Sequence, residues 1–285
     1  MADPAPPAVA PPRAPSFVEA SLRVFDLTLG QMLWSRRTIF LALVVGAPVA
    51  LAALFKALEA AGLAGIRVSG TRVAGPMVFG IFIWVLYLRF IIPVLGVFYG
   101  TSLIADEVEE KTITYLFTRP IARAAVLGGK YLAYLVCTVL VVLPSVVLVY
   151  LLMVPIRGGG MASSFPSLVI DLGLLGAGLA VYGAFFTLIG AWLKHPLITG
   201  LVFAFGWEPG VLMIPGYLRK FTIAYYLQAL VPQGMPQEGV ASLLQSVFRD
   251  VPSTWVCLLS LAVIGIGSLV VAGWVVEKRE YVLEQ

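Results

Sequence analysis

Charged residues are scarce in this chain. Asp, Glu, Lys and Arg together make up 12% of its 285 residues, about half the share of a soluble domain. Hydrophobic residues make up 60%, and the mean hydropathy is +0.97. The core of a soluble protein of this size cannot hide so many uninterrupted apolar runs, so the composition excludes an ordinary soluble domain. The sequence predicts a polytopic membrane protein.

Cysteine and histidine are nearly absent, which limits the chemistry that the chain can perform. Cys137 and Cys257 both lie in apolar stretches, so we interpret them as buried thiols and not as a disulfide or a metal pair. His195 is the only histidine, which leaves no histidine-containing metal cluster. The sequence also offers no Ser-His-Asp or Cys-His set and no intramembrane pair of carboxylates. We therefore expect neither an enzyme nor a metal site.

Clustered positive charge is missing as well. The net charge of +4 is spread over several loops and forms no basic block. A nucleic-acid-binding surface needs such a block, so the sequence predicts no nucleic-acid partner.

Six apolar stretches predict helices that cross a bilayer, which takes about 20 residues each. A break is expected at Gly206–Gly210, because Pro209 removes a backbone donor, and residues 211–231 are expected to form an interfacial or re-entrant segment. Six crossings place both termini on one side, and the basic pairs Arg36-Arg37 and Lys278-Arg279 favour the cytoplasmic side. The predicted spans of this domain (residues 38–285) are about 38–55, 77–105, 131–154, 168–193, 196–207 and 253–276.

The residues before the first span divide into a tail and a helix. Residues 1–15 are rich in Ala and Pro, so we expect a disordered tail without a cleavable signal peptide. Residues 16–37 predict an amphipathic helix at the membrane interface, with Ser16 and Glu19 as a capping box at its start. The alternative is a soluble helix packed on a partner. The apolar face is expected to contain Val18, Leu22, Phe25, Leu29 and Met32.

A charged stretch, Asp106 to Arg123, lies between the second and third spans. Lipid hydrocarbon does not accept such charges, so this segment must lie in water or against another protein. It predicts a short helix that presents the apolar side chains of Ile113, Leu116 and Phe117 and ends at Pro120. The alternative is a solvated loop without a partner.

The residues of this stretch resemble the cytoplasmic loop of ABC-type exporter permeases of the type-2 family. In that family an acidic cluster leads to a Thr, a short hydrophobic helix, a Pro-x-x-Arg turn and a Gly-Lys that opens the next span. Lys111 stands where the family usually has Gly. The resemblance covers roughly Leu86 to Leu140 and rests elsewhere on the number and order of spans. The matching residues are Glu107, Glu109, Glu110, Thr112, Leu116, Pro120, Arg123, Gly129 and Lys130.

The resemblance implies an all-α polytopic membrane protein of six transmembrane helices, with a cytoplasmic coupling helix between spans 2 and 3. It further implies a separate ATPase subunit that binds ATP and Mg, and a second permease subunit, identical or homologous. Gly128-Gly129-Lys130 is not a phosphate-binding loop, because the earlier Gly and the following Ser or Thr are missing. The residues implied to couple to the ATPase are Glu107, Glu109, Glu110, Thr112, Ile113, Leu116, Phe117, Arg119, Pro120 and Arg123.

By the same resemblance the chain exports a lipid-like, glycan, peptide or drug substrate across the cell membrane, the inner membrane of a bacterium. The alternative function is a membrane anchor or mechanical transmitter that the same kind of ATPase drives. Ionisable residues within spans are the candidates for a transport path. These are Asp171, expected at the outer surface, Glu208, expected at an outer exit or in water, and Arg89, expected near the outer interface. The small residues at small-xxx-small spacing in the fourth span, Gly173, Gly176, Ala177, Ala180 and Ala184, predict close helix packing.

Overall fold

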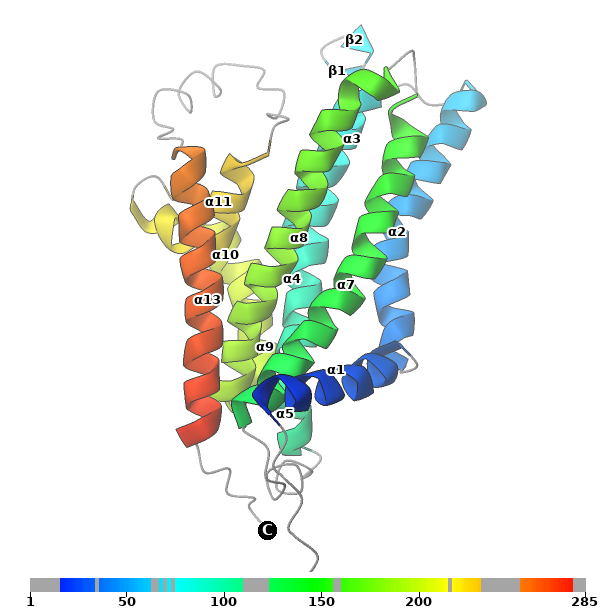
Figure 1. Cartoon of the computed structure of the whole chain (residues 1–285). Helices are drawn as coiled ribbons and strands as arrows, with labels where there is room; N and C mark the ends of the chain where they lie inside the picture. The colour runs from blue at the N-terminus through cyan, green and yellow to red at the C-terminus, as the bar shows by residue number, and fades with distance from the viewer. Residues whose placement is uncertain are drawn as a thin grey trace, which may run out of the picture.

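The computed structural model describes residues 16–33, 36–62, 67–68, 71–72, 75–109, 123–155, 160–214, 217–231 and 252–278. Nearly all of these residues are helical, and the helices form one bundle with α1 lying across one end (Figure 1). The elements are α1 (Phe17–Leu33), α2 (Arg36–Ala60), β1 (Arg67–Val68), β2 (Thr71–Arg72), α3 (Gly75–Ile81), η1 (Phe82–Ile91), α4 (Ile92–Leu95), η2 (Gly96–Gly100), α5 (Ser102–Glu109), α7 (Arg123–Met153), α8 (Met161–Trp192), α9 (Pro196–Val202), η4 (Phe203–Trp207), α10 (Glu208–Met213), η5 (Tyr217–Phe221), α11 (Ile223–Ala229) and α13 (Thr254–Lys278).

Among the described residues, five helices are long and apolar enough to cross a membrane. They cover Thr38–Ala60, Gly75–Ala105, Arg123–Met153, Met161–Trp192 and Thr254–Lys278. An α-helix satisfies its own backbone hydrogen bonds, which is why such apolar sequences adopt it in lipid. This confirms the predicted helical membrane architecture, to which the structure adds the short β1–β2 hairpin. The predicted fifth span, residues 196–207, falls in a shorter apolar helix, Pro196–Leu212, so the count of six crossings stays a prediction.

The second of these helices runs from Gly75 to Glu109 through α3, η1, α4, η2 and α5, and we call it the α3–α5 helix. Two of its segments, η1 and η2, are π-helical, with wider turns than an α-helix. The short hairpin of β1 and β2 precedes it, with Arg67 paired to Arg72. The hairpin lies at the end of the bundle opposite α1 (Figure 1).

α8 is the central helix of the bundle. It packs against α7, α13 and the α3–α5 helix, and it buries large side chains such as Tyr182 and Phe186. Close approach depends on glycine: a Cβ at Gly183 would overlap the ring of Tyr134, and one at Gly190 would overlap the backbone oxygen of Thr101.

Two of the small residues that the sequence analysis selected on α8, Gly173 and Gly176, do not make such contacts, whereas a third, Ala184, is fully buried in the core. Gly173 and Gly176 have no atom within 4 Å of the position that a Cβ would take. That prediction was wrong for these two glycines, because their spacing places them away from the surfaces on which α7 and the α3–α5 helix pack.

The predicted break at Gly206–Gly210 is also wrong. α9, η4 and α10 form one continuous helix from Pro196 to Met213, which we call the α9–α10 helix. A proline in an α-helix clashes with the carbonyl four residues earlier and donates no hydrogen bond. Here Pro209 lies in the first turn of α10, and the π-helical segment η4 directly precedes that helix. The π-helical segment shifts the hydrogen-bond register, so that the N–H of Glu208 bonds the oxygen of Phe203. The chain leaves helical geometry at Ile214 instead.

Both ends of the described chain lie at the same end of the bundle. α1, the last turn of α5, the start of α7 and the end of α13 gather there (Figure 1). The opposite end holds α11 and the start of α13, together with the β1–β2 hairpin. The two ends of the segment between α5 and α7 are therefore neighbours, and this arrangement positions the candidate coupling site.

Candidate functional site

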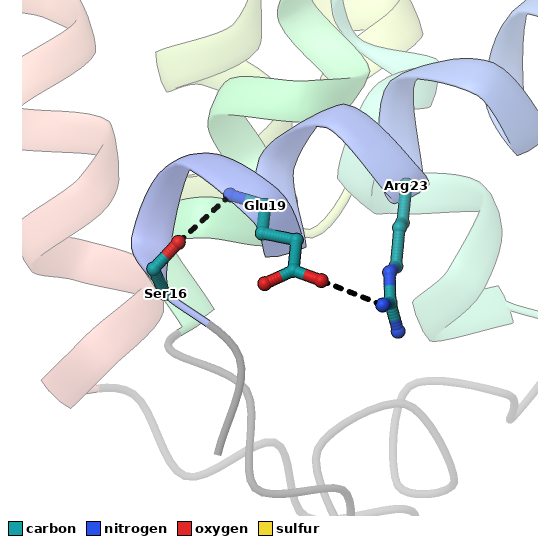
Figure 2. A network of polar contacts seen from close by, with 3 residues as sticks. All are labelled: Ser16, Glu19 and Arg23. Atoms are coloured by element: carbon teal, nitrogen blue, oxygen red, sulfur yellow. Dashed lines mark hydrogen bonds and ion pairs between the residues drawn. The ribbon is translucent and has the colours of Figure 1, made fainter. Parts of the chain in front are cut away.

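The capping of α1 matches half of the sequence prediction. The Ser16 hydroxyl accepts a hydrogen bond from the backbone N–H of Glu19 at 3.3 Å, as an N-cap does. The Glu19 carboxylate turns instead toward Arg23, whose Nη2 lies 2.7 Å from its Oε1 (Figure 2). Both charged side chains are mostly exposed, so the ion pair adds little stability. Together they mark the charged side of α1.

The apolar side of α1 differs from the predicted single face. Ala20 and Ser21 are the buried residues, whereas Val18 and Leu22 are 64% and 57% exposed. Phe25, Leu29 and Met32 are half-buried. The helix thus has three sides: a small-residue side on the bundle, an exposed apolar side and a charged side. Sequence periodicity could not separate the first two, because it does not show where small residues allow close packing.

Gly129 explains why α1 packs through its small residues. A Cβ at Gly129 would overlap the backbone oxygen of Ser21 and would lie 2.9 Å from the Cβ of Val24. α1 and α7 therefore cross almost backbone to backbone at this glycine. The Ser21 hydroxyl donates a hydrogen bond to the oxygen of Ala125 at 3.0 Å, which fixes the crossing one turn earlier on α7.

Lys130, the next residue, joins α7 to the end of the α3–α5 helix. Its side chain is only 8% exposed, and its Nζ donates a hydrogen bond to the backbone oxygen of Leu103 at 3.0 Å. Beside it, a small apolar cluster holds the same helices together with α8 and α13. The cluster consists of Ile104, Leu127, Ala191, Ala272 and Val276.

Arg123 lies at the first position of α7 and contacts the end of α13. Its Nη1 lies 3.5 Å from the backbone oxygen of Val276 and 3.3 Å from that of Glu277. The last carbonyl groups of a helix have no partner within the helix, so a guanidinium there satisfies them and opposes the helix dipole. Arg123 thus ties the segment that leads into α7 to the last helix of the bundle.

The other predicted coupling residues are placed only in part. Glu107 and Glu109 lie in the last turn of α5, so they end the α3–α5 helix and do not open a new one. The remaining residues lie outside the described part of the chain: Glu110, Thr112, Ile113, Leu116, Phe117, Arg119 and Pro120. The structure does place both ends of this segment, at α5 and α7, next to each other and next to α1 and α13.

Glu208, a predicted path residue, does not face water in the described structure. Its side chain is 2% exposed. Its Oε1 accepts hydrogen bonds from the backbone N–H groups of Ile223 at 2.9 Å and Ala224 at 3.3 Å, and the Tyr182 hydroxyl donates to its Oε2. The expectation of an exposed carboxylate failed because the helix continues through Glu208 and directs the side chain inward.

Asp171 and Arg89 have opposite environments. Asp171, in α8, is fully buried, so it does not face water at the outer surface as the sequence suggested. Arg89, in η1, is exposed, and its guanidinium lies 5.4 Å from the ring centroid of Trp84. The nearby face is apolar, with Phe90 in ring contact with Phe205 at 5.9 Å. The three candidates are thus not brought together in one site.

Sequence reasoning missed Tyr182 and the structural role of Lys130. Tyr182 gave no signal in the sequence, because a tyrosine within a span is common and its partner lies 26 residues away. Lys130 was noted as part of a motif, but its bond to Leu103 depends on how two helices pack.

Comparison with models of known protein families gives a match over most of the chain. A family model described as "ABC-2 family transporter protein" matches residues 19–281, which include all five of the long apolar helices. No curated protein matches the chain.

Proposed function

Because the chain belongs to the ABC-2 transporter family, we propose that it is the permease subunit of an ATP-driven exporter that works with a separate ATPase. The match over residues 19–281 carries this proposal. The family consists of membrane components and not of ATPases, so ATP and Mg are expected in the partner. The bundle itself supports a permease: its apolar helices are held together at one end by the residues around the 110–122 segment.

The proposal includes six crossings. The five long helices supply five, and the α9–α10 helix followed by α11 supplies the sixth as a broken helix. The last crossing, α13, has an exposed Trp near each end, Trp255 at 81% and Trp274 at 56%. They are nineteen positions apart, about 28 Å of helix, which matches a hydrocarbon core of roughly 30 Å between two aromatic belts.

The end of the bundle that holds α1 is assigned to the cytoplasm. Arg36 and Arg37 begin α2, and Lys278 ends α13, at this same end. Basic residues next to spans remain on the cytoplasmic side. α1 then lies at the inner surface, with Val18 and Leu22 toward lipid and Glu19 and Arg23 toward water. Both termini are cytoplasmic in this orientation.

The ATPase is proposed to dock on the segment of residues 110–122. Its two ends enter α5 and α7, whose positions are coupled through Lys130 and Leu103. A push on the segment would therefore move α5, α7 and α1 together, and Arg123 would pass the movement to α13. This is how closure of the ATPase would reach the membrane-spanning helices.

A second permease subunit, identical or homologous, is proposed to complete the transport path. The exposed apolar face around Arg89 and Phe90 is the surface that would contact the second subunit or the cargo. The cargo classes remain those of the resemblance: a lipid-like molecule, a glycan, a peptide or a hydrophobic drug.

The experiment starts from co-expression of the tagged chain with an ABC ATPase encoded beside it. The purified complex is reconstituted in vesicles, and ATP-dependent movement of a fluorescent lipid, a glycan, a peptide and a drug is measured. We expect co-purification and movement of one class away from the ATPase side. Failure of any ATPase to co-purify would contradict the permease role. ATP hydrolysis without movement of any cargo would instead favour the mechanical transmitter.

A further inference from the structure

The sixth crossing is broken in a place where a break is costly. Helical geometry stops after Met213, the 3-10 turn η5 follows, and α11 begins at Ile223. The first N–H groups of a helix have no partner within it. Within the depth of a bilayer, no water is available to satisfy them, so another protein group must do so.

Glu208 supplies that group from 15 residues upstream. Its Oε1 accepts hydrogen bonds from the N–H groups of Ile223 and Ala224, the first two of α11. Thr222, which occupies the N-cap position, bonds the oxygen of Arg219 at 2.8 Å and does not cap α11. The carboxylate of Glu208 therefore replaces the missing cap and joins the two halves of the broken helix.

The same carboxylate also joins these halves to the central helix. The hydroxyl of Tyr182, in α8, donates to Oε2, so one side chain connects α8, α10 and α11. Tyr182 is fully buried and its ring stacks on that of Phe186, with centroids 6.0 Å apart. This packing restricts how far Tyr182 can follow Glu208 if α10 moves.

The connection lies near the middle of the bilayer in the proposed placement. The Cγ2 of Val181 lies 3.5 Å from the position that a Cβ would take at Gly265. Gly265 is midway between Trp255 and Trp274 along α13. Tyr182 follows Val181 directly, so its bond to Glu208 is far from both water surfaces. Ionisable residues at such depth are rare and typically belong to the transport machinery.

Beyond this connection, the outer half of the broken helix is a small unit held together by its own bonds. The Tyr226 hydroxyl donates to the oxygen of Lys220 at 2.9 Å, and Thr222 bonds Arg219. The side of η5 that faces away from the bundle is open, with Tyr217 and Phe221 80% and 74% exposed. Because these bonds join η5 to α11, the two can move together as one body.

We propose that Glu208 and Tyr182 form a latch that holds residues 217–229 against α8, and that release of this latch opens the outer half of the transport path. Glu208 and Tyr182 are positioning residues in this proposal, since neither is required to touch cargo. The proposal rests on the proposed exporter function for its opening step, but the closed latch itself is a property of the chain alone.

The latch is tested by the reactivity of a cysteine placed behind it. Leu227, in α11, is fully buried, so Leu227→Cys should react slowly with a water-soluble thiol reagent, as should the buried Cys137 and Cys257. In the full chain reconstituted in nanodiscs, Glu208→Ala and Tyr182→Phe should each speed the labelling of residue 227. We expect about tenfold for Tyr182→Phe, the factor for one lost buried hydrogen bond of roughly 1.4 kcal/mol.

Tyr131→Phe is the matched control. Its hydroxyl donates to the oxygen of Ala180 at 2.8 Å, so this variant also loses a tyrosine hydrogen bond to α8, but away from α11. Labelling of residue 227 should not change in it. Equal labelling in Tyr182→Phe and Tyr131→Phe would overturn the latch. If Glu208→Ala also speeds the labelling of Cys137, the whole bundle has loosened in that variant. The comparison of Tyr182→Phe with Tyr131→Phe then decides whether the latch exists.

The opening step is tested separately with the complete complex. During ATP hydrolysis, residue 227 should be labelled faster in the Leu227→Cys protein with Glu208 and Tyr182 intact. Unchanged labelling during turnover would overturn the role in opening while leaving the closed latch in place. If the exporter proposal is wrong, the complex will show no ATP-driven transport. The labelling differences among the nanodisc variants would still be observed, because they depend on the chain alone.

Discussion

The Nζ of Lys130 donates a hydrogen bond to the backbone oxygen of Leu103 at 3.0 Å. The bond joins the helix that enters the 110–122 segment to the helix that leaves it. The lysine is 8% exposed, and in the proposed function it lies where movement of that segment would reach the bundle. Gly129, the preceding residue, brings α1 to the same point.

Lys130→Met should lower the stability of the purified protein. Methionine keeps most of the side-chain volume but leaves the oxygen of Leu103 without this donor, at a cost of about 1–3 kcal/mol. Thermal unfolding in detergent measures the effect. Lys194→Met, at an exposed position between α8 and α9, removes the same charge and should leave the unfolding temperature unchanged. Equal effects of both variants would show that charge, and not the bond, is responsible.

Gly129→Ala should displace α1 from α7. The new Cβ overlaps the backbone oxygen of Ser21, and backbone cannot give way as a flexible side chain can. Gly128→Ala is the control, since its Cβ would find only the Oγ of Ser21, at 3.9 Å. Labelling of a cysteine at the buried Ala20 reports the displacement. Identical labelling of the two variants would contradict the close crossing.

Leu22→Asp should weaken the membrane contact of α1. Leu22 is 57% exposed on the apolar side of the helix, so the change does not disturb the contact with α7. A charge moved into the hydrocarbon boundary costs on the order of 2 kcal/mol or more. Phe25→Asp, at a half-buried position, should impair assembly as well, whereas Asp26→Asn should not. Correctly assembled protein in all three variants would argue for a solvated helix.

Leu116→Asp should abolish binding of the ATPase or uncouple hydrolysis from transport, with the helices still inserted. An unpaired carboxylate in an interface typically costs a few kcal/mol, roughly a hundredfold in affinity. Co-purification of the ATPase measures the effect. Ala61→Asp, at the opposite end of the bundle, should have no effect. Undiminished, cargo-stimulated ATPase with the Leu116→Asp subunit would falsify the docking role.

Cysteines introduced at residues 3 and 284 should react only with reagents that enter the cell. This follows from the shared end of α1 and α13 and from the basic residues found there. A cysteine at Ala61, at the other end, should react from outside. The reverse pattern would invert the proposed orientation.

The sequence alone determined that this chain is an all-helical membrane protein of the ABC-2 type. Long apolar runs admit few structures in lipid, because every backbone group must be satisfied within the segment, so composition and length suffice to predict a helical membrane protein. The ABC-2 type was predicted from the resemblance of the charged stretch between the second and third spans. The capping role of Ser16 was equally local and was predicted correctly.

Only the tertiary structure decided which face of each helix is buried and which polar groups meet. The helix passes through Pro209 because a π-turn precedes it, and Glu208 turns inward to Tyr182 and α11 for the same reason. On α8, Gly183 and Gly190 make the close contacts and Gly173 does not. Periodicity gives the spacing of residues along one helix, but partners that are 15 to 27 residues apart meet only through the packing of several helices.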